Sequence, residues 1–247
     1  MDYSYILPVE FQSGWVVFSI VVAFLGTYTG LTAAAQIRGS TGEPPRVQPL
    51  CTAALALGGV GVWGMHFIGM RAQILPFLLD YDTGATLVSL AVAVGFCGFA
   101  MWYAASGKPT LGRSVLSGCL AGLGVVTMHY TGMVGTNMPI LGVEWHRETV
   151  ILSVVLAVVA ATATMWLTFR IATLWARALG ALLMTVGITG MHYTATLAAG
   201  LVCYTDQRIV AEPSMSVVSF LAALLMAVVA TLIMLSAFYS GGRKVNA

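Results

Sequence analysis

The chain has 247 residues, of which 59% are hydrophobic and only 8% are charged. About a quarter of the residues in a soluble domain are usually charged, so this composition excludes an ordinary soluble domain. The net charge of +2 is close to neutral. It gives no indication of nucleic acid binding, and we expect no nucleic acid partner.

Long apolar blocks follow one another along the chain. A helix that crosses a bilayer needs about 20 apolar residues. Seven blocks reach this length without an interior Asp, Glu, Lys or Arg: residues 15–35, 50–70, 84–105, 114–134, 149–169, 180–201 and 217–239. The segment before the first block lacks the basic residues of a cleavable signal peptide. The sequence therefore predicts an all-α protein with seven transmembrane helices, forming one membrane domain over residues 1–247 in the lipid bilayer.

The basic residues predict the orientation of these helices. Eight Lys and Arg residues lie in the loops after the first, third and fifth helices and in the C-terminal tail, whereas Arg71, Arg147 and Arg208 lie on the other side. Loops rich in Lys and Arg stay in the cytoplasm. We therefore predict an extracytoplasmic N-terminus and a cytoplasmic C-terminus.

A six-residue motif occurs three times. It begins at Met65-His66, at Met128-His129 and at Met191-His192, and successive histidines are 63 residues apart. A fixed period indicates a repeated structural unit, here at about residues 12–75, 76–138 and 139–201. Each unit holds two helices, so the chain returns to the same side and the repeats are parallel. All three histidines are then expected at one depth, near the extracytoplasmic ends of the second, fourth and sixth helices. The helix at 217–239 lies outside the repeat.

The residues of the motif suit a metal ion. Positions i and i+4 share one face of a helix, which pairs His66 with Met70 and His129 with Met133. Thioether ligands favour copper, above all Cu(I), whereas imidazole alone also suits zinc. Haem remains an alternative, because His and Met are both axial ligands of haem iron. The methionines that precede the histidines, Met65, Met128 and Met191, point about 100° away, and are either additional ligands or packing residues.

Several other residues carry less information. His146 lies in the charged run Glu144–Glu148 and receives no role. Tyr81-Asp82 precedes the third helix, where a capping role is favoured over an approach to the histidines. The four cysteines have no metal-ligand spacing and are expected to be small buried residues.

The three motifs resemble the MHYT domain, a family of bacterial integral membrane sensor modules. Two copies carry its letters verbatim, from Met128 to Thr131 and from Met191 to Thr194, and the copy at Gly61–Met70 is similar to the usual first-motif variant. The resemblance covers about residues 12–201. It implies a bacterial inner-membrane sensor of a diatomic gas (O2, CO or NO), with copper held by the motif histidines and methionines. It also implies signalling to cytoplasmic cyclic-di-GMP enzymes as partners. The third copy departs from the pattern, since Thr196 stands where Met70 and Met133 stand in the others.

Two other functions fit the same residues. Three histidines can hold zinc and an activated water, so a membrane-embedded zinc hydrolase is the alternative. It would need a general base, and the candidates are Asp80, Asp82, Glu144 and Asp206 in the outer loops. A copper transporter or carrier is the third choice. It ranks last because transport needs ligands at successive depths, whereas the motifs are expected at one depth.

No apolar block carries a carboxylate that could act as the general base. We therefore expect a sensor rather than an enzyme.

Overall fold

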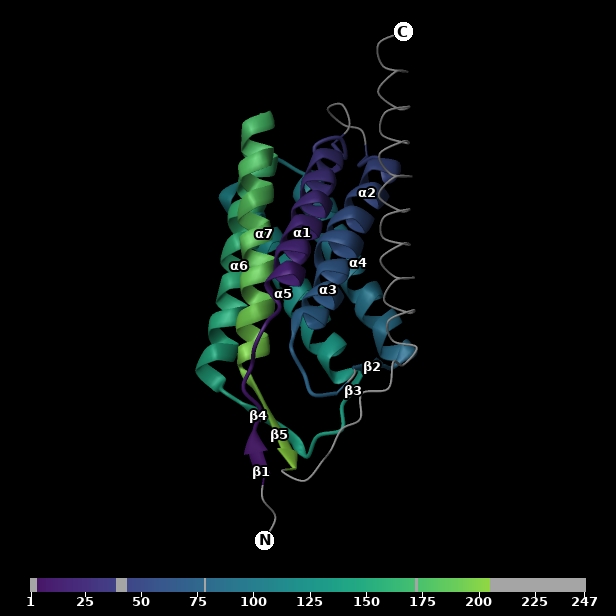
Figure 1. The fold of residues 1–247 in the computed structure, drawn as a ribbon. Helices are drawn as coiled ribbons and strands as arrows, with labels where there is room; N and C mark the ends of the chain where they lie inside the picture. Colours follow the sequence, from purple (N-terminus) through teal and green to yellow (C-terminus); the bar gives the residue numbers. More distant parts are fainter. Residues whose placement is uncertain (1–3, 39–43, 78, 172, 205–247) are drawn as a thin grey trace.

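A computed structural model describes residues 4–38, 44–77, 79–171 and 173–204 as a bundle of helices with short strands at one end (Figure 1). Six helices are long and apolar enough to cross a membrane. Five of them are continuous α-helices: α1 (Ser13–Ala34), α4 (Thr83–Ala105), α5 (Leu111–Val134), α6 (Arg147–Arg170) and α7 (Leu174–Leu197). The remaining span, Val47–Ala72, joins α2 (Val47–Ala54), the π-helix η1 (Leu55–Gly64) and α3 (Met65–Ala72).

Six of the seven predicted helices are therefore present, and the protein is an all-helical membrane protein. The predicted helix at 217–239 lies outside the described residues. The sixth helix spans Leu174–Leu197 rather than the predicted residues 180–201, so it begins and ends earlier in the chain than expected. Residues Ala199–Tyr204 form a strand instead. Hydropathy does not separate the last turn of a helix from a buried strand, and both are apolar here.

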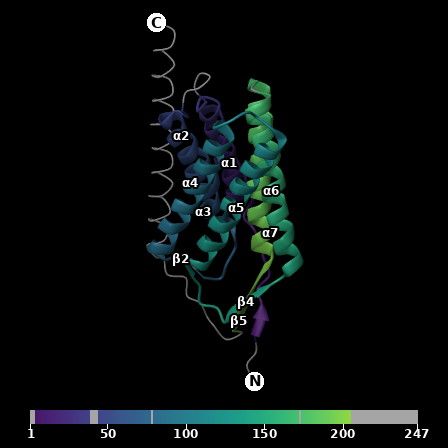
Figure 2. The same cartoon turned by 180° about the vertical axis from the view of Figure 1, so that it is seen from behind.

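The helices form a closed ring. Each span packs against the next one along the chain, and α7 packs against α1. In the two opposite views, α1 lies at the front of Figure 1 and α5 at the front of Figure 2. The second, fourth and sixth spans are 72%, 44% and 50% buried, against 39%, 28% and 33% for the other three. The spans that carry the histidine motifs are therefore the inner ones.

Short strands cover the end of the bundle at which the described residues begin, which we call the strand end (Figure 1). Strands β1 (Ser4–Ile6), β5 (Ala199–Tyr204) and β4 (Gly142–Trp145) form an antiparallel sheet in that order. Strands β2 (Asp80–Tyr81) and β3 (Thr136–Asn137) form a separate pair. The sheet joins the N-terminal segment to the end of α7, because Tyr5 pairs with Cys203. From the sequence, Asp80 and Glu144 were expected in outer loops, and residues 199–201 in the sixth helix.

The four cysteines follow the expectation in part. Cys97 and Cys203 are buried, Cys119 is half-buried and Cys51 is exposed, and all four are free thiols. Cys51 differs because α2 turns it away from the other helices.

Candidate metal centre

The three motif histidines occupy equivalent positions near the strand end of the inner spans. His66 lies in α3, His129 in the last turns of α5 and His192 in the last turns of α7. Their exposed fractions are 0%, 0% and 1%. A buried polar side chain is costly in a membrane. Three of them at one level therefore require a common partner or a common ligand.

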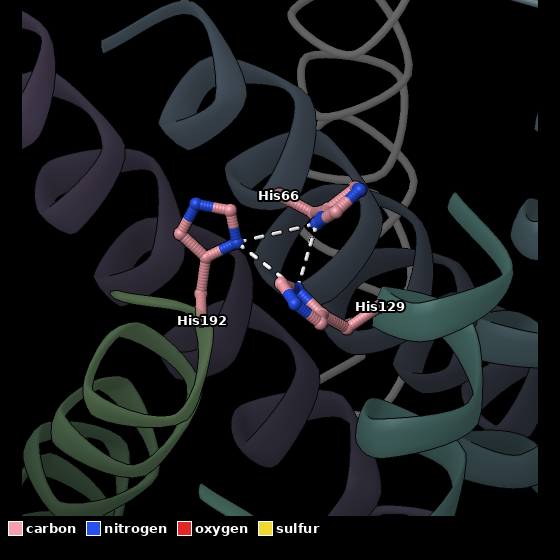
Figure 3. A group of neighbouring side chains, drawn as sticks. All are labelled: His66, His129 and His192. Atoms are coloured by element: carbon pink, nitrogen blue, oxygen red, sulfur yellow. Dashed lines mark hydrogen bonds between the residues drawn. The ribbon is translucent and has the colours of Figure 1, made fainter. Parts of the chain in front are cut away.

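The histidines point toward one another (Figure 3). The Nδ1 atom of His66 lies 3.1 Å from Nδ1 of His129 and 3.2 Å from Nδ1 of His192, and the third side of the triangle is also 3.2 Å. The rings meet edge to face, with centroids 4.9–5.2 Å apart. The three histidines, which were expected at one depth, therefore meet at a single site.

The three Nδ1 atoms cannot all be satisfied by hydrogen bonds to one another. Each Nδ1 either carries a proton or presents a lone pair. Among three such atoms, at least two are in the same state, so at least one pair repels. A cation that accepts all three lone pairs removes this repulsion. The centre of the triangle lies about 1.8 Å from each nitrogen, close to the roughly 2.0 Å of zinc–imidazole bonds. The residues present therefore fit a metal ion, and together they are a candidate metal site.

The outer nitrogens of the rings lie against the backbone of neighbouring repeats. A Cβ atom added to Gly69 would lie 2.3 Å from Nε2 of His192, and one added to Gly132 would lie 2.5 Å from Nε2 of His66. Each of these glycines stands three residues after a motif histidine, and Ala195 takes this place in the third repeat. Among the described residues, no hydrogen-bond partner is found for Nε2 of His66 and His129, whereas the His192 ring interacts with the backbone of Gly69.

The motif methionines form two groups on either side of the histidines along the chain. Met65, Met128 and Met191 belong to the main core of the bundle. Met70 and Met133 form a second cluster with Ala199, against which Leu79 and Val143 pack. All five thioethers are buried. Thr196, which replaces the third methionine of the second group, donates a hydrogen bond to the backbone oxygen of His192 (2.8 Å).

An aromatic residue supports each histidine. Phe67, Tyr130 and Tyr193 directly follow the histidines, and each ring meets its histidine edge to face with centroids 4.8–5.1 Å apart. A second aromatic residue packs on each of these rings from the strand end; these residues are Tyr81, Trp145 and Phe11. Every histidine is thus backed by two aromatic rings in series.

Three buried serines complete this arrangement, and the sequence analysis missed them. Ser19, Ser89 and Ser153 are hydrogen-bonded to Tyr193, Trp63 and Tyr130 respectively. A signal for them exists in the sequence: each serine follows one of the outer aromatic residues by eight positions, in the pairs Phe11–Ser19, Tyr81–Ser89 and Trp145–Ser153.

Among the outer-loop residues discussed above, Tyr81 approaches the histidines. Asp82 caps α4 by accepting a hydrogen bond from the backbone of Ala85 (2.7 Å), as predicted, whereas Tyr81 approaches the site through Phe67. Burial raises the pKa of Tyr81, and nearby Arg71 acts in the opposite direction. Asp80 and Glu144 are exposed, and Asp206 lies outside the described residues. His146 is exposed at the start of α6 and is separate from the other histidines.

Comparison with known proteins assigns the chain to a family. Residues 59–117, 122–181 and 186–244 match the MHYT family, described as a bacterial signalling protein N-terminal repeat. Each match begins five or six residues before the methionine that opens a histidine motif.

Three curated relatives share this part of the sequence. The bifunctional diguanylate cyclase/cyclic di-GMP phosphodiesterase MucR of Pseudomonas aeruginosa is 39% identical over 74% of this chain and 27% of its own length. The cyclic di-GMP phosphodiesterase NbdA of the same organism is 31% identical over 74% of this chain and 24% of its own. The signaling protein YkoW of Bacillus subtilis is 24% identical over 78% of this chain and 24% of its own.

The chain thus spans about a quarter of the length of these relatives. No solved structure gives a significant match. The threefold match covers most of the sequence, and its motifs are the ones that bring the three histidines together. The chain therefore belongs to the MHYT family of bacterial signalling proteins.

Proposed function

We propose that this chain is a metal-binding sensor domain that holds copper at its three motif histidines and detects a diatomic gas (O2, CO or NO). The observation that carries the proposal is the triangle of Nδ1 atoms, 3.1–3.2 Å apart and shielded from solvent. Three histidine ligands leave a further coordination position for a small ligand. When bound, copper would supply reversible coordination of the gas.

The surroundings of the histidines support copper over harder metals. Met70 and Met133 stand one helical turn beyond His66 and His129, and both are buried. Thioether sulfur prefers Cu(I), whereas calcium, magnesium and manganese prefer carboxylate oxygen. Asp80, Asp82 and Glu144 are exposed rather than turned toward the histidines. This also places a zinc hydrolase below the sensor, because hydrolysis needs a general base near the metal.

The apolar cover of the strand end supports a small uncharged ligand. Met70, Met133 and Ala199 form a buried cluster with Leu79 and Val143. A further cluster contains Phe77, Leu201 and Cys203. Ions and polar solutes pay a large desolvation cost to cross such layers, whereas a diatomic gas does not. A copper carrier would need a polar route with ligands at several depths, so it remains the third choice.

The site is proposed to face outward and to signal inward. Six described Lys and Arg residues lie toward the end of the bundle opposite the strands, and two, Arg71 and Arg147, lie at the strand end. The positive-inside rule then places the strand end and the N-terminus outside the cytoplasmic membrane of a bacterium. The printed names of MucR and NbdA describe cyclic-di-GMP enzymes. We propose that this chain also controls a cytoplasmic enzyme of that class.

Metal analysis of the purified chain tests the proposal. Copper should be retained in stoichiometric amount, and His66→Ala, His129→Ala and His192→Ala should each abolish its retention, because two remaining imidazoles bind far more weakly. Met70→Leu and Met133→Leu keep the side-chain volume nearly constant. They should weaken Cu(I) binding, measured by competition with a chelator, without lowering the unfolding temperature appreciably.

The control is His146→Ala, because this histidine is exposed and distant from the triangle. It should leave copper retention unchanged. Addition of CO or NO to the reduced copper protein should change its infrared or absorption spectrum. Stoichiometric zinc that neither methionine variant affects would reject the copper sensor and raise the hydrolase above it.

A further inference from the structure

A ring of three serines lies beside the histidines, at the same level of the bundle. Ser19 in α1, Ser89 in α4 and Ser153 in α6 are each fully buried. Each lies on an outer span, seven residues into its helix, counting the first helical residue. Their hydrogen-bond partners, Tyr193, Trp63 and Tyr130, lie on the inner spans. The three pairs therefore link every inner span to an outer neighbour.

The direction of these hydrogen bonds is determined by the backbone. Each serine donates its own proton to the carbonyl oxygen three residues earlier, at distances of 2.7–2.8 Å. A hydroxyl has one proton to donate, so its lone pairs remain to accept a second bond. Tyr193 therefore donates to Ser19 (2.8 Å), and Tyr130 donates to Ser153 (3.2 Å). The indole nitrogen of Trp63, which is always a donor, reaches Ser89 at 3.1 Å.

The three links join the six spans into three pairs. Trp63 connects the second span to α4, Tyr130 connects α5 to α6, and Tyr193 connects α7 back to α1 across 174 residues of sequence. Each inner span is held at the level of its histidine by one such bond. Interhelical hydrogen bonds in membranes are individually modest. Here two of them act on tyrosines in direct contact with an imidazole, and the third acts on Trp63, which reaches His66 through Phe67.

In the first repeat, a tryptophan rather than a tyrosine donates the hydrogen bond to the serine. Phe67 replaces tyrosine and has no hydroxyl to donate. Trp63, one turn earlier on the same face, packs on Phe67 with ring centroids 4.8 Å apart and supplies the donor to Ser89. The route from serine to histidine is therefore Ser89, Trp63, Phe67 and His66, whereas the tyrosine alone makes this connection in the other two repeats.

We propose that Ser19, Ser89 and Ser153 are positioning residues for the metal centre, each of which holds one histidine in place through the aromatic residue bonded to it. This inference rests on the proposed metal-binding function. Removing the hydroxyl of Ser19 or Ser153 leaves the tyrosine donor unpaired in an apolar environment, so its ring moves and the imidazole resting on that ring loses its alignment. Removing that of Ser89 leaves the indole of Trp63 with one partner, the carbonyl oxygen of Thr86 at 3.2 Å, so the effect on His66 is smaller. Residues of this kind typically change metal affinity by about 10- to 100-fold.

The test compares Ser19→Ala, Ser89→Ala and Ser153→Ala with Ser117→Ala. Ser117 is an equally buried serine of α5 that makes the same bond to the carbonyl three residues earlier. It lies 12 residues from His129, which is about 18 Å along the helix. Ser19→Ala and Ser153→Ala should lower copper affinity about 10- to 100-fold, and Ser117→Ala should leave it within about twofold. Ser89→Ala should have an intermediate effect, because Trp63 keeps its bond to Thr86. Phe67→Tyr should restore affinity to the Trp63→Phe variant, because it recreates the tyrosine of the other repeats.

A second measurement does not depend on metal. Diethyl pyrocarbonate acylates accessible histidines, and mass spectrometry resolves the rate for each one in the metal-free chain. Ser19→Ala should raise the rate at His192, and Ser153→Ala the rate at His129, each about fivefold. Ser89→Ala should raise the rate at His66 by a smaller factor, because Trp63 keeps its bond to Thr86. Absence of copper from the unaltered chain would overturn the proposed function but not these paired rates. Copper affinity and rates that match those of Ser117→Ala would overturn the positioning role alone.

Discussion

Single glycines determine how closely the motif histidines approach the neighbouring repeats. Nε2 of His66 lies where a side chain on Gly132 would begin, and Nε2 of His192 occupies the same place at Gly69. The third repeat has Ala195 at this position and Thr196 at the next. The site is therefore threefold in its nitrogens but not in its surroundings, as the departure of the third motif from the other two predicts.

Gly132→Ala tests this close approach. The added Cβ would lie 2.5 Å from Nε2 of His66, so the imidazole must move out of the triangle. We expect a loss of about 1–3 kcal/mol of stability from overpacking and a loss of bound metal. Gly95→Ala is the matched control, because no atom lies within 4 Å of its added Cβ. Thermal unfolding and metal content measure both effects. Equal unfolding temperatures and full metal content in the two variants would contradict the assignment.

At the scale of elements, the spans are joined by contacts between backbones. A Cβ added to Gly26 of α1 would lie 2.3 Å from the backbone nitrogen of Gly61 in η1, and one added to Gly58 would lie 2.6 Å from the backbone oxygen of Ala93 in α4. Small residues of this kind allow helices to pack closely in a membrane. The π-helix η1 therefore lies tightly between α1 and α4, directly before the motif that carries His66.

Gly26→Ala should separate α1 from η1. The new methyl group meets backbone atoms, which move only with the whole helix, so we expect about 1–3 kcal/mol of destabilisation. Gly14→Ala, in the same helix, has no atom within 4 Å of its added Cβ and should be neutral or slightly stabilising. Denaturation of both variants in the same detergent makes the comparison. A Gly26→Ala variant as stable as Gly14→Ala would show that the two helices separate without cost.

At the scale of the whole molecule, the strand end and the opposite end differ in charge and in cover. Arg71 and Arg147 lie at the strand end, and the other described basic residues lie toward the opposite end. The sheet β1-β5-β4 joins three distant segments over the strand end. The proposed orientation places this cover, and the histidines beneath it, on the extracytoplasmic side.

Cysteine labelling of whole cells tests this orientation. In a variant without the four native cysteines, Glu148→Cys at the strand end should react with a membrane-impermeant maleimide added outside. Lys108→Cys, which is exposed at the opposite end, should react only after the cells are permeabilised. The reverse pattern would place the histidines near the cytoplasm and contradict the proposed topology.

The sequence by itself determined the membrane class, six described spans, the period of 63 residues and the equal depth of the histidines. These features follow from local hydropathy and from the parity of crossings, which need no knowledge of distant contacts. Only the tertiary structure decided that the Nδ1 atoms meet, because this requires α7 to close on α1. The serines were missed for the same reason: Ser19 and Tyr193 are 174 residues apart. Strand β5 was missed because its apolar residues continue the pattern of the sixth helix. The other strands have only two to four residues each, and pairing partners far along the chain distinguish them from loops.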